Sequence, residues 1–141
     1  GNGTTIENIY VADGADDAIE FFGGSVNVKG LLAVNCDDDM FDFTQGYCGT
    51  LSDCYGRWEE GFTSTEEDPR GVEADGNLDG KGPDHTPQSN FKIENMTIEN
   101  LSKEAEMQDA IKAASEQLPM ENGAVDFAAQ LSSMHWLKDL D

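Results

Sequence analysis

The chain has 141 residues, of which 29 are Asp or Glu and 8 are Lys or Arg, so its formal net charge is −21. A surface with this charge repels phosphate backbones and anionic lipid headgroups, which excludes nucleic acid from the expected partners and leaves cations, basic proteins and neutral sugars. No apolar run approaches the ~18–20 residues of a membrane span, so no transmembrane segment is predicted.

The first fifty residues contain the same pattern twice. Residues 6–27 align without a gap on residues 28–49, and the matched positions are either apolar in both copies or carry the same Asp or Gly residue. The matched pairs include Ile6/Val28, Ile9/Leu31, Ile19/Phe41 and Phe21/Phe43. Apolar residues alternate with polar or small ones over short stretches, as in β-strands, and corners rich in Gly or Asn separate these stretches. A period in the twenties with strand alternation is typical of a solenoid. Because the Leu lattice and Asn ladder of a leucine-rich repeat are missing, we predict a right-handed parallel β-helix.

Two weaker copies follow. The third begins at 51–64, with Leu51 at the Val28 position, and a small shift in register then places Glu59 and Glu60 on Asp38 and Asp39, and Phe62 on Phe41. The fourth begins with "IENMTIEN" at 93–100, which repeats "IENIYVAD" at 6–13 almost letter for letter. Gly, Pro, Asp and Asn dominate the segment between them, so we predict a long loop inserted at one corner over about 65–90.

The pattern changes after Asn100. Residues 102–118 are typical of an amphipathic helix, although the letters "DAI" at 109–111 repeat those at 17–19, so the segment could instead close the fourth coil. Residues 124–140 are predicted to be helical, and Trp136 of this helix is expected to be a packing residue. The chain would then divide into β-helix coils over 1–101 and a mainly helical segment over 102–141 that caps the open end of the solenoid.

Several segments of the sequence resemble those of a known protein family. The runs "DDAIEFFGGSVNVKGLLAVNCDDDMFDFTQGY" and "TPQSNFKIENMTI" are similar to those of secreted or surface-anchored β-helix proteins, often lipoproteins, of gut Bacteroidetes. The resemblance covers roughly residues 5–112. It implies a β-helix fold and a location in the medium, at the cell surface or in the periplasm, and it implies no particular activity. Relatives usually carry more β-helix beyond Lys112, where this sequence turns to a helical pattern.

Stacked acidic residues form the first candidate site. Neighbouring strands lie about 4.8 Å apart, so Asp16 and Asp17 are predicted to lie beneath Asp38 and Asp39. Carboxylates this close repel each other, so they either face solvent or hold a cation, and oxygen ligands favour Ca²⁺. The same four residues could serve as the catalytic carboxylates of a retaining glycosidase. The structural alternative is a solvated acidic edge or Asp side chains that cap corner amides.

The predicted loop contains a second candidate for Ca²⁺. The run "DGNLDG" at 75–80 matches the opening of a calcium-binding loop. An EF-hand is rejected because Thr86 stands where that motif needs Glu. A different calcium loop would use Asp75, Asn77, Asp79 and Asp84 as ligands, whereas the alternative is a series of tight turns.

Aromatic residues around the third coil form the last candidate. Exposed rings at Tyr47, Tyr55 and Trp58 could stack on sugar faces, although part of this group is expected in the core.

The sequence therefore predicts a mainly β protein, a short right-handed parallel β-helix of about four coils with a helical C-terminal cap. Its predicted role is a non-catalytic extracellular binding or scaffold module, with Ca²⁺ as the candidate cofactor, that contacts glycans or surface proteins. The alternative is a fragment of a polysaccharide-active enzyme, a glycoside hydrolase or lyase. A third hypothesis is end-to-end self-association through the open coil faces.

Overall fold

The computed structural model describes residues 1–67, 69–76, 86–102 and 134–138, which form two parallel β-sheets and contain no helix. The five-stranded sheet has the order β1-β3-β5-β7-β8, and the three-stranded sheet has the order β2-β4-β6. The strands of the first sheet are β1 Thr5–Ala12, β3 Asn27–Val34, β5 Thr50–Trp58, β7 Lys92–Asn100 and β8 Met134–Lys138. Those of the second are β2 Ile19–Phe22, β4 Phe41–Thr44 and β6 Val72–Ala74.

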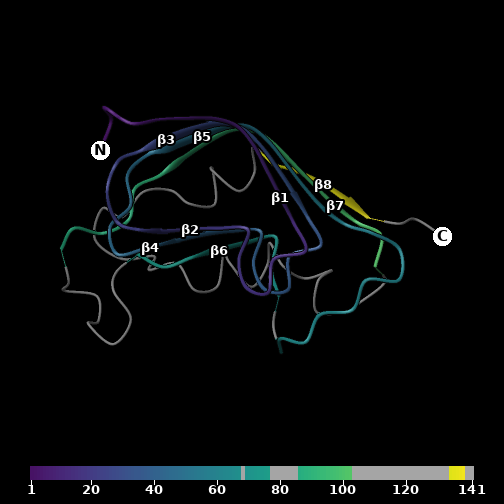
Figure 1. Ribbon diagram of the computed structural model, residues 1–141. Helices are drawn as coiled ribbons and strands as arrows, with labels where there is room; N and C mark the ends of the chain where they lie inside the picture. Colours follow the sequence, from purple (N-terminus) through teal and green to yellow (C-terminus); the bar gives the residue numbers. More distant parts are fainter. Residues whose placement is uncertain (68, 77–85, 103–133, 139–141) are drawn as a thin grey trace.

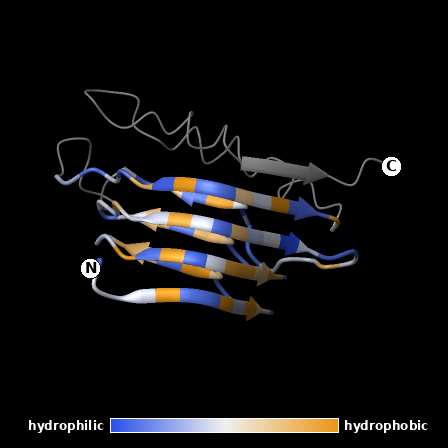
Figure 2. Ribbon diagram, turned by 90° about the horizontal axis from the view of Figure 1, so that it is seen from above, coloured by the Kyte–Doolittle hydropathy of each residue, from blue (hydrophilic) through white to orange (hydrophobic). Residues whose placement is uncertain are grey.

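The chain passes from one sheet to the other and back, so each pair of strands is one coil of a parallel β-helix. Figure 1 shows the two sheets facing each other, with corners that connect them. Figure 2 shows the strands of the five-stranded sheet side by side. All strand pairings in the described part of the chain are parallel. The predicted parallel β-helix is therefore confirmed, and β7 follows three coils whose strands lie in both sheets.

Strand pairing follows the repeat in the sequence. Residues one period apart are direct partners in neighbouring strands, as in Ile6 with Val28 and Phe21 with Phe43. Leu51 pairs with Val28, and Ile93 pairs with Leu51, so the third and fourth copies begin where the sequence predicts. Equivalent apolar side chains therefore stack coil upon coil.

The core between the sheets is a column of aromatic rings with aliphatic residues around it. The rings of Phe21 and Phe43 stack with centroids 5.7 Å apart, and Phe91 stacks on Phe43 at 4.1 Å. Val28 and Leu51 of the facing sheet are fully buried. Each such side chain contributes about 1.5–3 kcal/mol through burial, so the inward ladders stabilise the stack of coils.

The second half of the third coil differs from the prediction. Val72 pairs with Phe41 and Glu73 with Asp42, so Phe62 does not stand on Phe41. Arg70, rather than Glu60, lies over Asp39. The backbone N–H of Arg70 donates a hydrogen bond to Asp39 Oδ1 at 2.6 Å. The expected loop at about 65–90 therefore contains a strand, β6. The short strand "VEA" lies among Gly, Pro and Asp residues, which obscured its β-pattern.

The predicted helix at 124–140 is wrong over Met134–Lys138. These residues form β8, which pairs in parallel with β7, with Met134 opposite Met96 and Trp136 opposite Ile98. The edge of β7 offers unpaired backbone donors and acceptors, and pairing with them outweighs a weak local helix propensity. The remainder of the predicted cap, including the segment 103–118 with its two alternatives, lies outside the described residues.

Candidate functional site

Seven carboxylates from three successive coils lie along one corner of the β-helix and the outer face of the three-stranded sheet. We call them the acidic column: Asp16, Asp17, Glu20, Asp38, Asp39, Asp42 and Glu73. The corner before β2 contributes the first pair, and the corner before β4 contributes the equivalent pair one coil later. Glu20, Asp42 and Glu73 are direct partners on β2, β4 and β6. They alternate with inward apolar residues, so strand alternation turns them away from the core.

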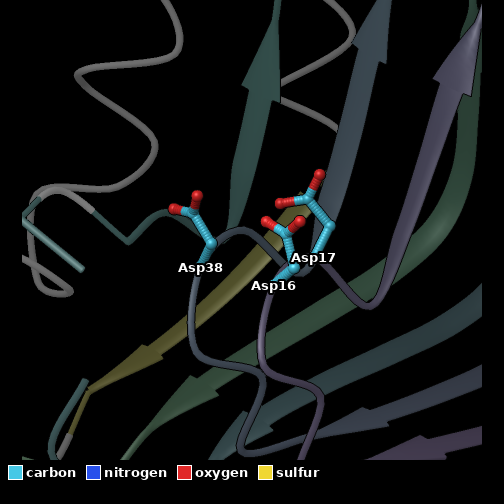
Figure 3. A group of neighbouring side chains, drawn as sticks. All are labelled: Asp16, Asp17 and Asp38. Carbon is cyan, nitrogen blue, oxygen red and sulfur yellow. The ribbon is translucent and has the colours of Figure 1, made fainter. Parts of the chain in front are cut away.

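Backbone amides hold the corner in place. Asp17 Oδ1 accepts a hydrogen bond from the backbone N–H of Asp39 at 3.0 Å, which ties the first coil to the second. Figure 3 shows the side chains of Asp16, Asp17 and Asp38 close together at this corner. The predicted stacking of the four corner aspartates is thus present, and so is the predicted capping of a corner amide by Asp.

Within the described residues, the acidic column forms three overlapping groups in which one carboxylate oxygen of each member lies within 4.8 Å of the others. The groups are Asp16/Asp17/Asp38, Asp17/Glu20/Asp42 and Asp39/Asp42/Glu73. Asp17 and Asp42 each belong to two groups, so the groups form a continuous set of oxygen atoms. Such a set suits a hard cation with oxygen ligands and lacks the nitrogen or sulfur ligands that zinc prefers.

Burial makes the charged form of these carboxylates unfavourable. Loss of hydration raises the pKa of Asp39 to about 11, and the nearby Glu73 raises it further. Burial also raises the pKa of Asp42 to about 8 and that of Asp17 to about 7, with contributions from neighbouring carboxylates. The pKa of Glu20 is raised for the same first reason. At neutral pH the column therefore needs protons or a cation to neutralise it.

Asp42 is the least satisfied member of the column. Asp42 is 8% exposed, and its Oδ1 atom is buried without a hydrogen-bond partner. A buried carboxylate oxygen without a partner costs about 1–3 kcal/mol or more, so native proteins seldom leave one uncompensated. A bound cation at the groups that Asp42 joins would compensate it.

The structure places the other predicted site residues in different surroundings. Asp75 follows β6 directly, and its backbone N–H donates to Phe43 O at 2.7 Å. The other three predicted loop ligands, Asn77, Asp79 and Asp84, lie outside the described residues, so the loop site stays a prediction.

Two of the three predicted sugar-binding rings belong to the core. Tyr47 and Trp58 are 0% exposed, and they donate hydrogen bonds to Val26 O at 2.7 Å and to Cys36 O at 3.0 Å. Such rings cannot stack on a ligand from solution. Tyr55 keeps some exposed surface on the outer face of the five-stranded sheet, where its hydroxyl donates to Glu99.

Sequence reasoning did not identify Glu20, Asp42 and Glu73 as members of the site. The repeat itself contained a signal for two of them, because Glu20 and Asp42 are one period apart, directly after the predicted corner. No such signal existed for Glu73, since the loop before β6 interrupts the period.

Comparison with known proteins gives one match. A family model described as a pectate-lyase-like β-helix domain matches residues 1–130. No curated protein and no solved structure matches the chain. In the described part of the chain there is no helix that could serve as a membrane span.

Proposed function

We propose, since the chain belongs to the family of pectate-lyase-like β-helix domains, that it is a non-catalytic extracellular module that binds polysaccharide and is stabilised by Ca²⁺. Domains of this family are commonly extracellular, and the fold suggests a role related to polysaccharides. Surface proteins remain an alternative class of partner. In this proposal the acidic column holds the coils together, and the ligand binds elsewhere on the solenoid.

The continuity of the acidic column across coils is the observation that supports a bound cation. Asp17 and Asp42 each belong to two of its three groups, and the Oδ1 atom of Asp42 is buried without a hydrogen-bond partner. Ca²⁺ takes six to eight oxygen ligands in flexible geometry, so carboxylates from successive coils suit it better than they suit the smaller Mg²⁺. The cation would replace repulsion between coils with attraction to a shared charge. The loop residues Asp75, Asn77, Asp79 and Asp84 are a second proposed calcium site.

Burial favours a structural role for the column over catalysis. Asp39 is 2% exposed and Asp42 is 8% exposed, so neither carboxyl group is accessible to a polysaccharide chain. A general acid or nucleophile must contact the glycosidic bond. The deep part of the column therefore suits an ion and excludes a polymer.

Thermal unfolding with added Ca²⁺ tests this proposal. Ca²⁺ at about a hundred times its Kd should raise the Tm by about 5–10 °C, because a ligand that binds only the native state adds about 2.7 kcal/mol to its stability. The Asp42→Asn variant should lose most of this increase. Binding should also release protons at neutral pH, since Asp42 has a pKa of about 8 and Ca²⁺ needs it ionised.

Glu60→Gln is the matched control, because Glu60 is an exposed carboxylate outside the column. It should keep the full increase in Tm. An unchanged Tm of the parent protein in millimolar Ca²⁺, with no heat of binding in calorimetry, would contradict the calcium part of the proposal.

One observation favours a second candidate, a polysaccharide-active enzyme. Asp17 has a pKa raised to about 7 and lies with the exposed Asp16 and the half-buried Asp38. A protonated carboxyl beside an ionised one is the usual acid and nucleophile pair of glycosidases. Release of reducing ends or unsaturated products from a polysaccharide panel, abolished in Asp38→Asn, would favour the enzyme over the binding module.

A further inference from the structure

The five-stranded sheet has an open edge at the N-terminal end of the solenoid. β1 is the first strand in the order of the sheet, and within the described residues only β3 pairs with it. Figure 2 shows this strand beside the N-terminus, at one side of the sheet. The backbone donors and acceptors that β1 directs away from β3 therefore have no strand partner in the part of the chain that the structure describes.

Apolar side chains of the first coil lack the layer that buries their equivalents one coil later. Ile9 is 39% exposed, whereas its direct partner Leu31 is 2% exposed. Ile6 is half-buried, whereas its partner Val28 is fully buried. On the outer face of the same strand, Tyr10 is 65% exposed. A further strand beside β1 would complete this layer of the core and exclude water from it.

Edge strands of most proteins are protected against pairing with another chain. Common protections are short length, Pro, Lys and inward-pointing charges. β1 has eight residues, "TIENIYVA", which include no Pro and no Lys, and the side chains that it directs inward are apolar. Such an edge favours the binding of an extended segment by strand addition, in which main-chain hydrogen bonds provide affinity and alternate side chains provide specificity.

Charge determines which segment this edge accepts. Residues 1–28 contain five acidic residues and no Lys or Arg. Of these acidic residues, Glu7, Asp13 and Asp16 are exposed. A second copy of the chain also carries a net charge of −21, so repulsion opposes pairing between copies. A segment that contains Lys or Arg is attracted to the same end of the solenoid.

We infer that the open edge of β1 binds an extended, basic segment of another protein, which adds to the sheet as one more strand. Its apolar side chains cover Ile6 and Ile9, and its Lys or Arg side chains lie on the outer face near Glu7. Opposite Asn8, whose φ is 56°, the segment carries Gly, Asn or Asp, because the neighbouring strands have a left-handed residue at this position. The inference concerns a protein partner and is independent of the proposed binding of polysaccharide and Ca²⁺.

Fluorescence anisotropy of labelled peptides with the full chain tests the inference. A chelator is present, so that Ca²⁺ does not alter the charge of the protein. The probe is Lys-Val-Lys-Gly-Leu-Lys-Val-Lys, in which Lys alternates with apolar residues around one Gly. In one control peptide Glu replaces every Lys, and in the other the same residues are reordered so that the apolar ones are contiguous.

The probe should bind at least about tenfold more tightly than either control peptide, because only the probe matches both the alternation and the charge of the edge. Its Kd should rise with salt, since exposed charges are screened. Hydrogen–deuterium exchange should show that bound probe protects the amides of β1.

Two variants with the same substitution test the contact with the edge. Ile9→Gln should raise the Kd of the probe about tenfold, because it removes apolar surface that the added strand covers. Leu32→Gln is the matched control, since Leu32 is also 39% exposed but lies on the outer face of β3, away from the open edge. It should leave the Kd unchanged. Circular dichroism and Tm should show that both variants fold, because both side chains are partly exposed.

A third variant tests the charge. Glu7→Gln/Asp13→Asn should raise the Kd about threefold and reduce its dependence on salt, because two exposed carboxylates are lost. Glu66→Gln/Glu67→Gln removes two exposed carboxylates outside the first coil and should change the Kd less.

Several outcomes would overturn the inference. Equal binding of the reordered peptide would show that charge alone holds the probe, and absence of binding by any peptide would leave the edge without this partner. Protection only outside β1, or an equal effect of Ile9→Gln and Leu32→Gln, would place the probe elsewhere. Dimers of the chain alone in light scattering, dissociated by Ile9→Gln, would show that a second copy occupies the edge.

Discussion

At the scale of single residues, the best example of a constrained position is Gly49, at the start of the third coil. A Cβ atom placed there would lie 2.1 Å from Val26 O and 2.3 Å from the Tyr47 hydroxyl oxygen. That hydroxyl already donates to Val26 O. Only a residue without a side chain allows this buried hydrogen bond and the close backbone approach together, so Gly49 serves the packing of Tyr47.

The Gly49→Ala variant should therefore unfold easily. We expect its free energy of unfolding to fall by about 3 kcal/mol, at the upper end of the usual cost of overpacking, because the neighbouring atom is a backbone oxygen that cannot move aside cheaply. Urea denaturation measures this loss. Gly24→Ala is the control: nothing lies within 4 Å of its added Cβ, and it should lose only about 1 kcal/mol from its positive φ. Equal losses in the two variants would show that the contact with Tyr47 has no special role.

At the scale of strands, one column of left-handed residues bends the five-stranded sheet. Each long strand of this sheet has one residue with positive φ at the equivalent position. These residues are Asn8 in β1, Gly30 in β3, Asp53 in β5 and Asn95 in β7, with φ of 56°, 74°, 54° and 58°. The Asn95 side chain donates to Asp53 Oδ1 at 2.8 Å, so neighbouring bends are also linked. Asn, Asp and Gly tolerate this conformation better than other residues do, which explains their presence in the middle of strands.

Replacing Asn95 tests this explanation. Asn95→Ala should lower the free energy of unfolding by about 1–2 kcal/mol, because Ala both adopts the left-handed conformation poorly and lacks the hydrogen bond to Asp53. Asn95→Gly keeps the conformation and loses only the hydrogen bond, so it should lose less. Chemical denaturation of both variants gives the comparison. A larger loss for Gly than for Ala would be inconsistent with a bend set by backbone conformation.

At the scale of the whole molecule, the acidic column links stability to pH. The pKa values of Asp17 and Asp42 are raised from 3.8 to about 7 and about 8 in the native state. Between those limits the native state binds more protons than the unfolded state does, so stability falls as pH rises. The stabilisation from these protons is complete below about pH 4 and is lost as pH rises through the native pKa values. A chain of net charge −21 also repels itself most strongly at high pH.

We therefore expect the metal-free protein to be less stable at about pH 8 than at about pH 5. The free energy of unfolding should fall by up to about 1.4 kcal/mol per pH unit for each carboxyl group that is protonated in the native state and ionised in the unfolded state. Urea denaturation in the presence of a chelator measures this slope. Asp42→Asn should flatten it, because the amide carries no charge to desolvate. Stability that rises with pH over this range would overturn the assignment of raised pKa values to the column.

The repeat in the sequence predicted part of the candidate site. Asp16, Asp17, Asp38 and Asp39 stack because they lie one period apart within two intact copies. Their burial was not predictable, since the exposure of an outward carboxylate depends on what covers it. The position of Glu73 in the column was not predictable either, because a loop of unusual length separates it from the previous coil.

The sequence by itself determined the coiled architecture, the stacking of Phe21 on Phe43 and the starts of all four copies. Strand alternation and the recurring apolar pattern are local properties, and in a parallel solenoid they suffice to set the register between neighbouring coils wherever the pattern is intact. Only the tertiary structure decided the place of β6, the strand character of Met134–Lys138 and the burial of Asp39 and Asp42. These features depend on partners distant in the chain: an open strand edge that needs backbone hydrogen bonds, and surroundings that exclude water from carboxylates.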